Sequence, residues 1–325
     1  MNTYPLLMAP HFVHGAQTPW GGTMLRDVFM KDAPDDITGV SMEVSAQPGL
    51  ESLVANGEHA GKTLAKMQEL WGEALTGAAC GEFPLLLKLL DVQQPFSVQV
   101  REGRNEVWVI LNAEPGAKIV YGLDTQGEPL EQIVSEGRIE KRLHWENVQP
   151  GDVYYIPAGM IHAIGEGILC YEIEETNDAA WRLWDWNRVD SAGNSRELHT
   201  AQAIAAADAE RRLSKNEGTT VLCKGGSRTY YVSDNSIELC RLNLSGRMPL
   251  ESGRMLVLTP LSECEVHWGE ESMTLRPFDT VLIPAALEGV MLEGCTKVLM
   301  SSLSNREALI GELGYRAENV AGLVD

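Results

Sequence analysis

The sequence predicts a mainly β protein made of two related barrel units with a few helices. Three observations lead to this prediction. Short runs of β-forming residues, separated by Gly, Pro, Asn and Asp, recur along both halves of the chain. A ten-residue pattern occurs twice. Helix periodicity is confined to two segments. Many short strands joined by turns are typical of a sandwich or barrel.

The predicted helices and strands follow from local residue patterns. A first helix is predicted within residues 59–76, where Leu64, Met67, Trp71 and Leu75 recur at three- and four-residue spacing. A second helix is predicted over 200–213, a segment rich in Ala. The first set of predicted strands is 84–92, 97–100, 106–111, 117–123, 152–158 and 168–175. The second set is 219–223, 229–233, 236–244, 255–259, 264–269 and 280–285.

The repeated pattern relates the two sets of strands. Residues 149–158 (QPGDVYYIPA) correspond to residues 276–285 (RPFDTVLIPA). In the same register, His162 of the first copy falls opposite Gly289 of the second. We therefore expect two domains: residues 1–217 with the functional site and the helical insertions, and residues 218–325 as a second unit without a metal site.

Composition and charge exclude several function classes. The chain has 325 residues and a formal net charge of −20, which disfavours nucleic acid and anionic membrane surfaces as partners. The six cysteines lie far apart and form no C-x-x-C pair, as is usual in a reducing cytoplasm. No targeting segment or membrane-spanning run is found. The sequence predicts a cytoplasmic protein and leaves its oligomeric state open.

A motif in the first unit points to a metal. A Gly-Asp turn at residues 151–152 is followed by a strand and by Pro157-x-x-x-x-His162. This pattern is typical of a cupin, the double-stranded β-helix or jelly-roll barrel. Side chains alternate in and out of a barrel, so His162 can project inward as a metal ligand. The alternative is a hydrogen-bonded core histidine.

Several segments resemble type I mannose-6-phosphate isomerases, in collinear order over most of residues 5–200. The segments that carry the resemblance include 83–100 (FPLLLKLLDVQQPFSVQV), 103–110 (GRNEVWVI), 113–122 (AEPGAKIVYG), 151–169 (GDVYYIPAGMIHAIGEGIL), 181–188 (WRLWDWNR) and 196–199 (RELH). The resemblance implies two cupin units, the second without a metal site.

The resemblance also implies a function and a set of site residues. It implies an intramolecular oxidoreductase that interconverts mannose 6-phosphate and fructose 6-phosphate through an enediolate, with one zinc ion per chain and a sugar phosphate as its small-molecule partner. The family's metal ligands correspond here to Gln99, Glu106 and His162. Its anion-binding and catalytic cations correspond to Lys88, Arg104 and Arg182. The general base is left open, and Arg188 and Arg196 are taken as structural.

One family ligand is missing. The family carries a further zinc-binding His where this chain has Arg101, and the acidic loop that follows is deleted. Residues 98–101 and 106–110 are expected to form an antiparallel hairpin with Arg101 opposite Glu106 on the same face. An arginine stays protonated and offers no lone pair to zinc, so it would pair with Glu106 instead.

Two outcomes follow from this replacement. In one, zinc is held by Gln99, Glu106, His162 and water, with His144 or His267 as further possible ligands. In the other, the Arg101–Glu106 pair replaces the metal, and the protein is a non-catalytic cupin that binds a sugar or sugar phosphate. A third hypothesis is an isomerase or epimerase that acts on a different sugar.

Overall fold

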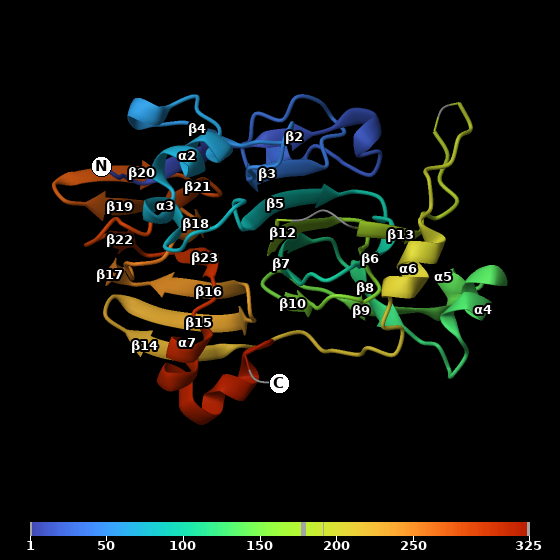
Figure 1. Ribbon diagram of the computed structural model, residues 1–325. Helices are drawn as coiled ribbons and strands as arrows, with labels where there is room; N and C mark the ends of the chain where they lie inside the picture. Colours follow the sequence, from blue (N-terminus) through green and yellow to red (C-terminus); the bar gives the residue numbers. More distant parts are fainter. Residues whose placement is uncertain (1, 177–179, 191, 324–325) are drawn as a thin grey trace.

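The computed structural model describes residues 2–176, 180–190 and 192–323. Two β units lie side by side, with the teal and green strands β5 to β13 in one and the gold to red strands β14 to β23 in the other (Figure 1). Each unit consists of two sheets. The prediction of a mainly β protein with two related units is confirmed.

The first unit contains a six-stranded and a five-stranded sheet. The six-stranded sheet has the order β10-β7-β12-β5-β3-β2, with bounds Val153–Ile156, Glu106–Ala113, Ile168–Glu175, Leu85–Val92, Val40–Val44 and His11–Val13. The five-stranded sheet has the order β13-β6-β11-β8-β9, with bounds Ala180–Trp184, Val98–Arg101, His162–Ile164, Lys118–Leu123 and Leu143–Asn147. All of the pairings within these two sheets are antiparallel.

The second unit contains an eight-stranded and a four-stranded sheet. The larger sheet has the order β14-β15-β16-β23-β18-β21-β1-β4, with bounds Thr219–Cys223, Gly226–Ser233, Ile237–Leu244, Lys297–Leu303, Leu256–Pro260, Thr280–Ile283, Leu6–Ala9 and Leu53–Val54. The smaller sheet has the order β17-β22-β19-β20, with bounds Gly246–Pro249, Met291–Gly294, Cys264–Trp268 and Glu271–Leu275. Strand β1 pairs with β21, so N-terminal residues extend a sheet whose other strands come mainly from beyond residue 217.

Helices are short and lie outside the barrels. The α-helices are α1 Met24–Asp27, α2 Leu64–Trp71, α3 Glu73–Thr76, α4 Leu130–Ser135, α5 Ile139–Arg142, α6 Thr200–Ala206 and α7 Arg306–Leu313. The 3₁₀ helices are Gly15–Gln17, Gly57–His59 and Gly314–Asn319. The helix predicted over 59–76 is divided at Gly72, whose φ of 50° is outside the helical region. The helix predicted over 200–213 ends at Ala206. No helix in the described ranges is long and apolar enough to cross a membrane.

The sequence repeat corresponds to a structural repeat. In the first copy Asp152 accepts a hydrogen bond from the backbone N–H of Gln149 at 2.9 Å, and in the second Asp279 accepts one from Arg276 at 2.9 Å. The residues before the two aspartates, Gly151 and Phe278, both have positive φ. Each turn leads into a strand, β10 or β21. The two copies therefore share their turn chemistry as well as their sequence.

The predicted hairpin of residues 98–110 is wrong. Strand β6 pairs with β11 and β13, whereas β7 pairs with β10 and β12, so the two strands belong to different sheets. The four residues between them cross from one sheet to the other. Arg101 and Glu106 nevertheless meet, because both side chains project into the space between the two sheets; their closest nitrogen and oxygen are 3.4 Å apart.

The two faces of β5 explain how this barrel holds charged groups. Leu85, Leu87 and Leu89 belong to a core that the two units share, together with residues such as Val257 and Leu299 of the second unit. Side chains alternate along a strand, so Lys88 projects to the opposite face, into the first barrel. Lys88 is only 9% exposed. The run of apolar residues is thus buried on both faces, and the lysine inside it is buried as well.

Candidate active site

Three of the predicted ligands lie together inside the first barrel. Gln99 is on β6, Glu106 begins β7 and His162 begins β11, directly opposite Gln99 in the strand register. The Nε2 atom of His162 is 2.7 Å from Oε1 of Glu106 and 3.1 Å from the side-chain nitrogen of Gln99. His162 and Glu106 are fully buried, and Gln99 is 7% exposed. Residues from two sheets thus converge on one point.

The hydrogen bonds at this point suit a metal ion. Nδ1 of His162 lies 2.8 Å from the carbonyl oxygen of Met160 and donates its proton there, so Nε2 is the ring nitrogen that faces Glu106 and can ligate a metal. Both carboxylate oxygens of Glu106 are buried, with Oε1 2.7 Å from Nε2 of His162 and Oε2 3.4 Å from Nε of Arg101. The Gln99 amide can present its oxygen by rotation about its last bond. A cation between these three groups would satisfy all of them, so the residues fit zinc.

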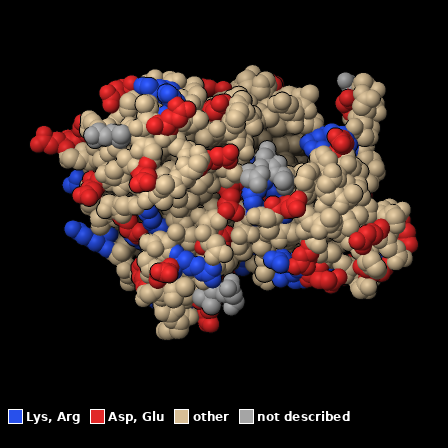
Figure 2. Space-filling model, viewed as in Figure 1, with Lys and Arg blue, Asp and Glu red and all other residues tan. Residues whose placement is uncertain are grey.

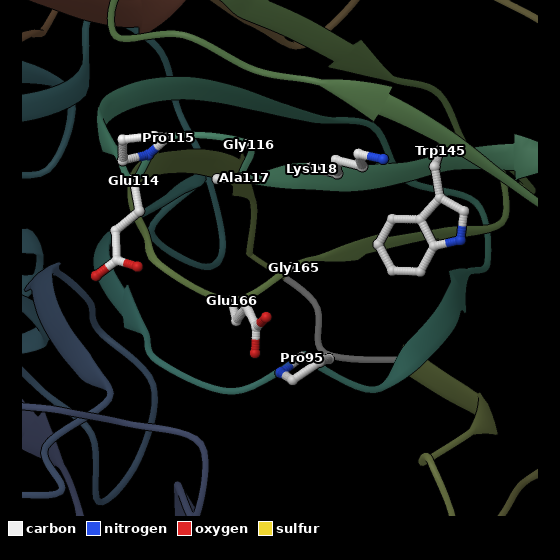
Figure 3. A pocket seen from close by; sticks show the side chains of 9 residues that line it. All are labelled: Pro95, Glu114, Pro115, Gly116, Ala117, Lys118, Trp145, Gly165 and Glu166. Carbon is white, nitrogen blue, oxygen red and sulfur yellow. The ribbon is translucent and has the colours of Figure 1, made fainter.

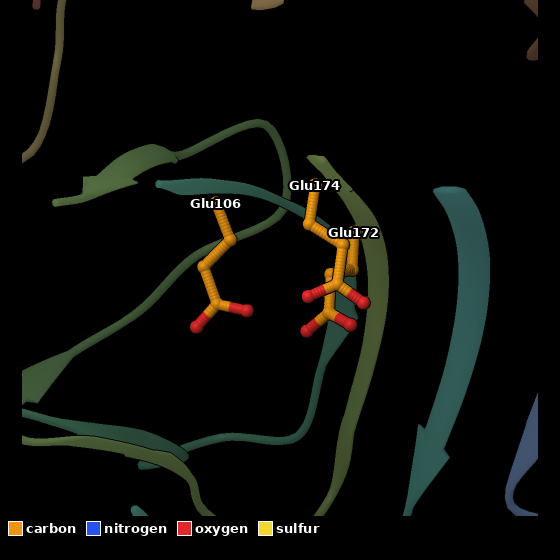
Figure 4. Close-up of side chains that lie close together, drawn as sticks. All are labelled: Glu106, Glu172 and Glu174. Atoms are coloured by element: carbon orange, nitrogen blue, oxygen red, sulfur yellow. The ribbon is translucent and has the colours of Figure 1, made fainter. Parts of the chain in front are cut away.

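A second set of carboxylates adjoins these ligands. Glu174 lies opposite Glu106 in the β12–β7 register. Glu172, two residues before Glu174, is on the same face of β12. Figure 4 shows the three carboxylates side by side, and one oxygen from each lies within 4.8 Å of the others. Adjacent like charges destabilise a sheet unless cations compensate them.

Two cations supply that compensation. Nζ of Lys88 lies 2.9 Å from Glu172 and also binds Glu174. An Nη of Arg101 lies 3.0 Å from Glu174. The indole of Trp108 donates a hydrogen bond to the other oxygen of Glu172 at 2.8 Å. Glu172 and Glu174 are therefore engaged by protein groups, and Glu106 is the carboxylate directed at His162.

These contacts shift the pKa values of the buried groups. Burial by itself raises the pKa of Glu106, but the contact with His162 at 2.7 Å and the charge of Arg101 outweigh it and hold that pKa below its usual value. Burial lowers the pKa of Lys88, but Glu172 and Glu174 outweigh it and hold that pKa above its usual value. The carboxylate of Glu106 is thus kept in the ionised form that a metal requires.

The remaining predicted cations occupy different places. Arg182 lies on β13 directly opposite Gln99, and it donates hydrogen bonds to the Ser97 hydroxyl and to the carbonyl oxygen of Glu197. Arg104 is 5% exposed and donates to the carbonyl oxygen of Glu175, where β12 ends. Lys88, as described, lies inside the carboxylate cluster.

The two further histidines considered as ligands lie elsewhere. His144 is on β9 near Glu146, with its side chain 44% exposed. His267 is on β19 in the second unit, near Glu265 and Glu293. Neither histidine contacts Gln99, Glu106 or His162 among the described interactions, so neither completes the ligand set.

Comparisons with known proteins identify the family. Residues 13–118 match the family described as phosphomannose isomerase type I, catalytic domain. Mannose-6-phosphate isomerase ManA of Bacillus subtilis is 31% identical over 323 residues, which cover 93% of this chain and 100% of that protein. The chain belongs to the type I phosphomannose isomerase family.

Solved structures agree with this assignment. A crystal structure of the mannose 6-phosphate isomerase from Bacillus subtilis superposes with a TM-score of 0.85 at 29% identity, covering 92% of this chain and 99% of that one. A zinc-bound mannose 6-phosphate isomerase superposes with a TM-score of 0.75 at 13% identity, covering 93% and 100%. The latter shares the fold. The cupin-type architecture predicted from the sequence is confirmed.

Arg101 occupies the position at which the resemblance implied a further zinc-binding histidine in the phosphomannose isomerase family. The side chain lies on the same face of β6 as Gln99, as expected, and its guanidinium lies nearer to Glu174 than to Glu106. Only Oε2 of Glu106 faces the guanidinium, at 3.4 Å from Nε. Oε1 faces His162. Arg101 therefore leaves one oxygen of Glu106 directed at the point where the ligands converge.

Sequence reasoning missed Glu172 and Glu174. They stand two residues apart, on either side of Ile173, at the end of an apolar run that begins at Ile168. Two carboxylates at this spacing on a strand share one face, and a buried face with two charges requires partners. That pattern, beside Lys88 in another apolar run, was a recognisable sign of a buried ionic cluster.

A surface cavity of this phosphomannose isomerase family member lies away from the ligands. Figure 3 shows Trp145, Lys118, Glu114 and Glu166 around it, and its volume is about 310 Å³. Glu114 follows the end of β7, whereas Glu106 begins that strand. The cavity is therefore at the opposite end of the barrel strands from the candidate metal centre.

Proposed function

We propose that this protein is a zinc-dependent mannose-6-phosphate isomerase, which interconverts mannose 6-phosphate and fructose 6-phosphate. The observation that carries the proposal is the convergence of Gln99, Glu106 and His162 inside the barrel of a type I phosphomannose isomerase family member. The similarity to ManA over its whole length supports an enzyme and not a binding protein without activity.

Each ligand residue has a defined task. Gln99, Glu106 and His162 would hold one zinc ion per chain, with a position left for water or substrate. The hydrogen bond from His162 Nδ1 to the Met160 carbonyl oxygen orients the imidazole. When bound, zinc supplies Lewis-acid polarisation of the substrate carbonyl.

The neighbouring cluster sets the charge around the ligands. Glu106, Glu172 and Glu174 carry three negative charges, and Lys88 and Arg101 carry two positive charges. The buried group is therefore short of positive charge by one, which favours a cation at the point where Gln99, Glu106 and His162 meet. With a divalent cation held there, these side chains would leave one excess positive charge, which would favour binding of an anion.

The proposed substrate is anionic although the protein is not basic. Figure 2 shows acidic side chains over much of one face, in keeping with the net charge of −20. Recognition of a phosphate therefore requires a local group of cations. Arg182, beside Gln99 on the neighbouring strand, belongs to such a group. We also propose a cytoplasmic location, which is supported by six cysteines that are all free thiols.

A substrate panel tests the proposal. Purified protein with added zinc is assayed on mannose 6-phosphate, glucose 6-phosphate, ribose 5-phosphate and unphosphorylated mannose. We expect turnover of mannose 6-phosphate with kcat/KM at least about a hundredfold above the other sugars, since specificity is a difference in transition-state binding. Preferred turnover of another aldose would refute the mannose assignment, and no turnover of any aldose phosphate by folded, zinc-loaded protein would refute the isomerase assignment.

A further inference from the structure

A group of arginines surrounds one serine at the edge of the candidate active site. The Ser97 hydroxyl donates a hydrogen bond to Oδ1 of Asp185 at 2.7 Å. The same hydroxyl accepts hydrogen bonds from Nε of Arg182 and from an Nη of Arg196, both at 3.2 Å. A third arginine, Arg188, lies 3.3 Å from Oδ1 of Asp185. Ser97 thus links two arginines that come from β13 and from the segment before α6.

The group has more positive than negative charge. Asp185 is 5% exposed and is the buried carboxylate among these arginines. It is 3.6 Å from Arg196 as well as 3.3 Å from Arg188. Burial lowers the pKa of Arg182, and the charge of Arg196 lowers it further. Three guanidinium groups against Asp185 and the exposed Glu197 leave an excess of positive charge, which an anion can neutralise.

Donors remain available for such an anion. The second Nη of Arg182, and Nε and the second Nη of Arg196, form no hydrogen bond within the described residues, and none of them is among the buried unpaired nitrogens. They are therefore accessible to solvent. The Arg196 side chain is 30% exposed. Figure 2 shows Lys and Arg side chains gathered at the base of the protruding segment that precedes α6. A guanidinium group with accessible donors matches the geometry of a phosphate.

The group lies at a suitable distance from the metal ligands. Ser97 precedes Gln99 by two residues and shares its face of the sheet, a separation of roughly 7 Å along a strand. Arg182 is directly opposite Gln99 on the neighbouring strand. A hexose 6-phosphate can bridge this span with its sugar carbonyl at the metal ligands and its phosphate at the arginines.

We propose that Arg196, together with Arg182, binds the phosphate group of the substrate, and that Ser97 holds the two guanidinium groups in position. Asp185 accepts the hydrogen bond of Ser97 and pairs with Arg188. Arg188 in turn donates a hydrogen bond to the carbonyl oxygen of Pro95. This assignment rests on the proposed function for its substrate class. It gives Arg196, taken from the sequence as structural, a role in substrate specificity.

The test compares binding of a phosphorylated and an unphosphorylated sugar. Fructose 6-phosphate and fructose are titrated into zinc-loaded wild type, Arg196→Gln and Arg196→Lys by calorimetry. The matched control is Arg276→Gln, since Arg276 is 78% exposed and pairs with Asp279 in the second unit. We expect Arg196→Gln to weaken fructose 6-phosphate binding about 10- to 100-fold and to leave fructose binding unchanged. Arg196→Lys keeps the charge but loses the planar donor pair, so its loss should be intermediate.

The outcomes separate this proposal from the proposed function. A change of less than about threefold in fructose 6-phosphate affinity, in an Arg196→Gln variant that isomerises normally, would overturn the phosphate assignment alone. An equal loss of affinity for fructose would also overturn it, because it would indicate a general disturbance of the site. The protein could instead bind fructose 6-phosphate through Arg196 but isomerise no aldose. The phosphate assignment would then stand, and the isomerase assignment would be refuted. In an active enzyme, KM for mannose 6-phosphate should rise more than kcat falls.

Discussion

Arg101 occupies the inner face of β6 two residues after Gln99 and carries a permanent charge into a buried cluster. Its guanidinium contacts Glu174 at 3.0 Å and faces Glu106 at 3.4 Å. Such a group compensates carboxylates but cannot ligate a metal. It also lowers the attraction of Glu106 for a second cation, since like charges near one carboxylate repel each other. We therefore expect zinc to bind here more weakly than in a site with a fourth protein ligand.

Replacement of this residue tests that expectation. Arg101→His removes the competing charge and supplies an imidazole on the same face as Gln99, so zinc affinity should rise by roughly ten- to a hundredfold. The dissociation constant is measured by competition with a chromophoric chelator. Arg101→Gln, which removes the charge without adding a strong ligand, is the control and should give a smaller gain. Equal or weaker zinc binding by Arg101→His would mean that residue 101 does not face the metal ligands.

At the scale of elements, Gly72 divides what the sequence predicted as one helix. It ends α2 and precedes α3 with φ 50° and ψ −125°, a conformation that residues with a Cβ rarely adopt. Helix periodicity continues across the break, which is why the pattern predicted a continuous helix. The division lets α3 approach the second unit, where the backbone N–H groups of Ala285 and Ala286 donate to Leu75 and Ala74.

A glycine substitution tests this account of the break. No atom lies within 4 Å of a Cβ added at Gly72, so the cost of Gly72→Ala is conformational, and we expect a loss of about 1–3 kcal/mol in the free energy of unfolding. Gly311, inside α7, also has open space around it and lacks a positive φ. Gly311→Ala should therefore be neutral or stabilise by up to about 1 kcal/mol. Urea denaturation measures both, and equal effects of the two substitutions would contradict the proposed conformational cause.

Many of the strands were predictable, but β11 and β13, which carry His162 and Arg182, were not, and neither were the strand partners. Alternation and turn residues are local, and they located β5, β7, β10 and β12 to within a few residues. Pairing depends on contacts between distant segments. Four residues between β6 and β7 satisfied the pattern of a hairpin, yet β6 pairs instead with β11 and β13, and the connection crosses between sheets. A short loop between two strands does not by itself make them neighbours.

The residues of the candidate active site were predicted only in part, because some of them depend on strand pairing. His162 was identifiable from its turn and strand, and the resemblance supplied Gln99 and Glu106. The contribution of Glu172 and Glu174 depends on the register of β12 against β5 and β7, which no local pattern contains. The burial of Lys88 likewise follows from its place on the inner face of the first barrel, where β12 brings Glu172 and Glu174 against it.

At the scale of the whole molecule, a buried ion pair joins the two units. Nζ of Lys31 lies 2.8 Å from Oε2 of Glu43 on β3 and 2.8 Å from the carbonyl oxygen of Phe278 in the second unit. The hydroxyl of Thr280 on β21 donates to the same oxygen of Glu43 at 2.8 Å. Glu43 is fully buried. The carboxylate therefore depends on partners from both units.

Loss of Lys31 should destabilise the whole protein. Lys31→Ala leaves Glu43 buried without its cation, at a cost of about 3–5 kcal/mol in the free energy of unfolding. Lys31→Ala combined with Glu43→Gln should recover part of this loss, because the buried charge is then absent. Chemical denaturation followed by tryptophan fluorescence measures the wild type and the two variants. A loss below about 1 kcal/mol for Lys31→Ala, or no recovery in the double variant, would show that the pair does not hold the units together.

The most direct test of the central claim combines zinc content with turnover in wild type and Glu106→Gln. The substitution keeps the shape of residue 106 and removes the charge that faces His162. We predict about one zinc per wild-type chain, isomerisation of mannose 6-phosphate that is lost in chelator and restored by zinc, and a Glu106→Gln variant that is folded, depleted of zinc and at least about a hundredfold slower. Undiminished turnover by zinc-free wild type, or by Glu106→Gln, would contradict a zinc centre at Gln99, Glu106 and His162.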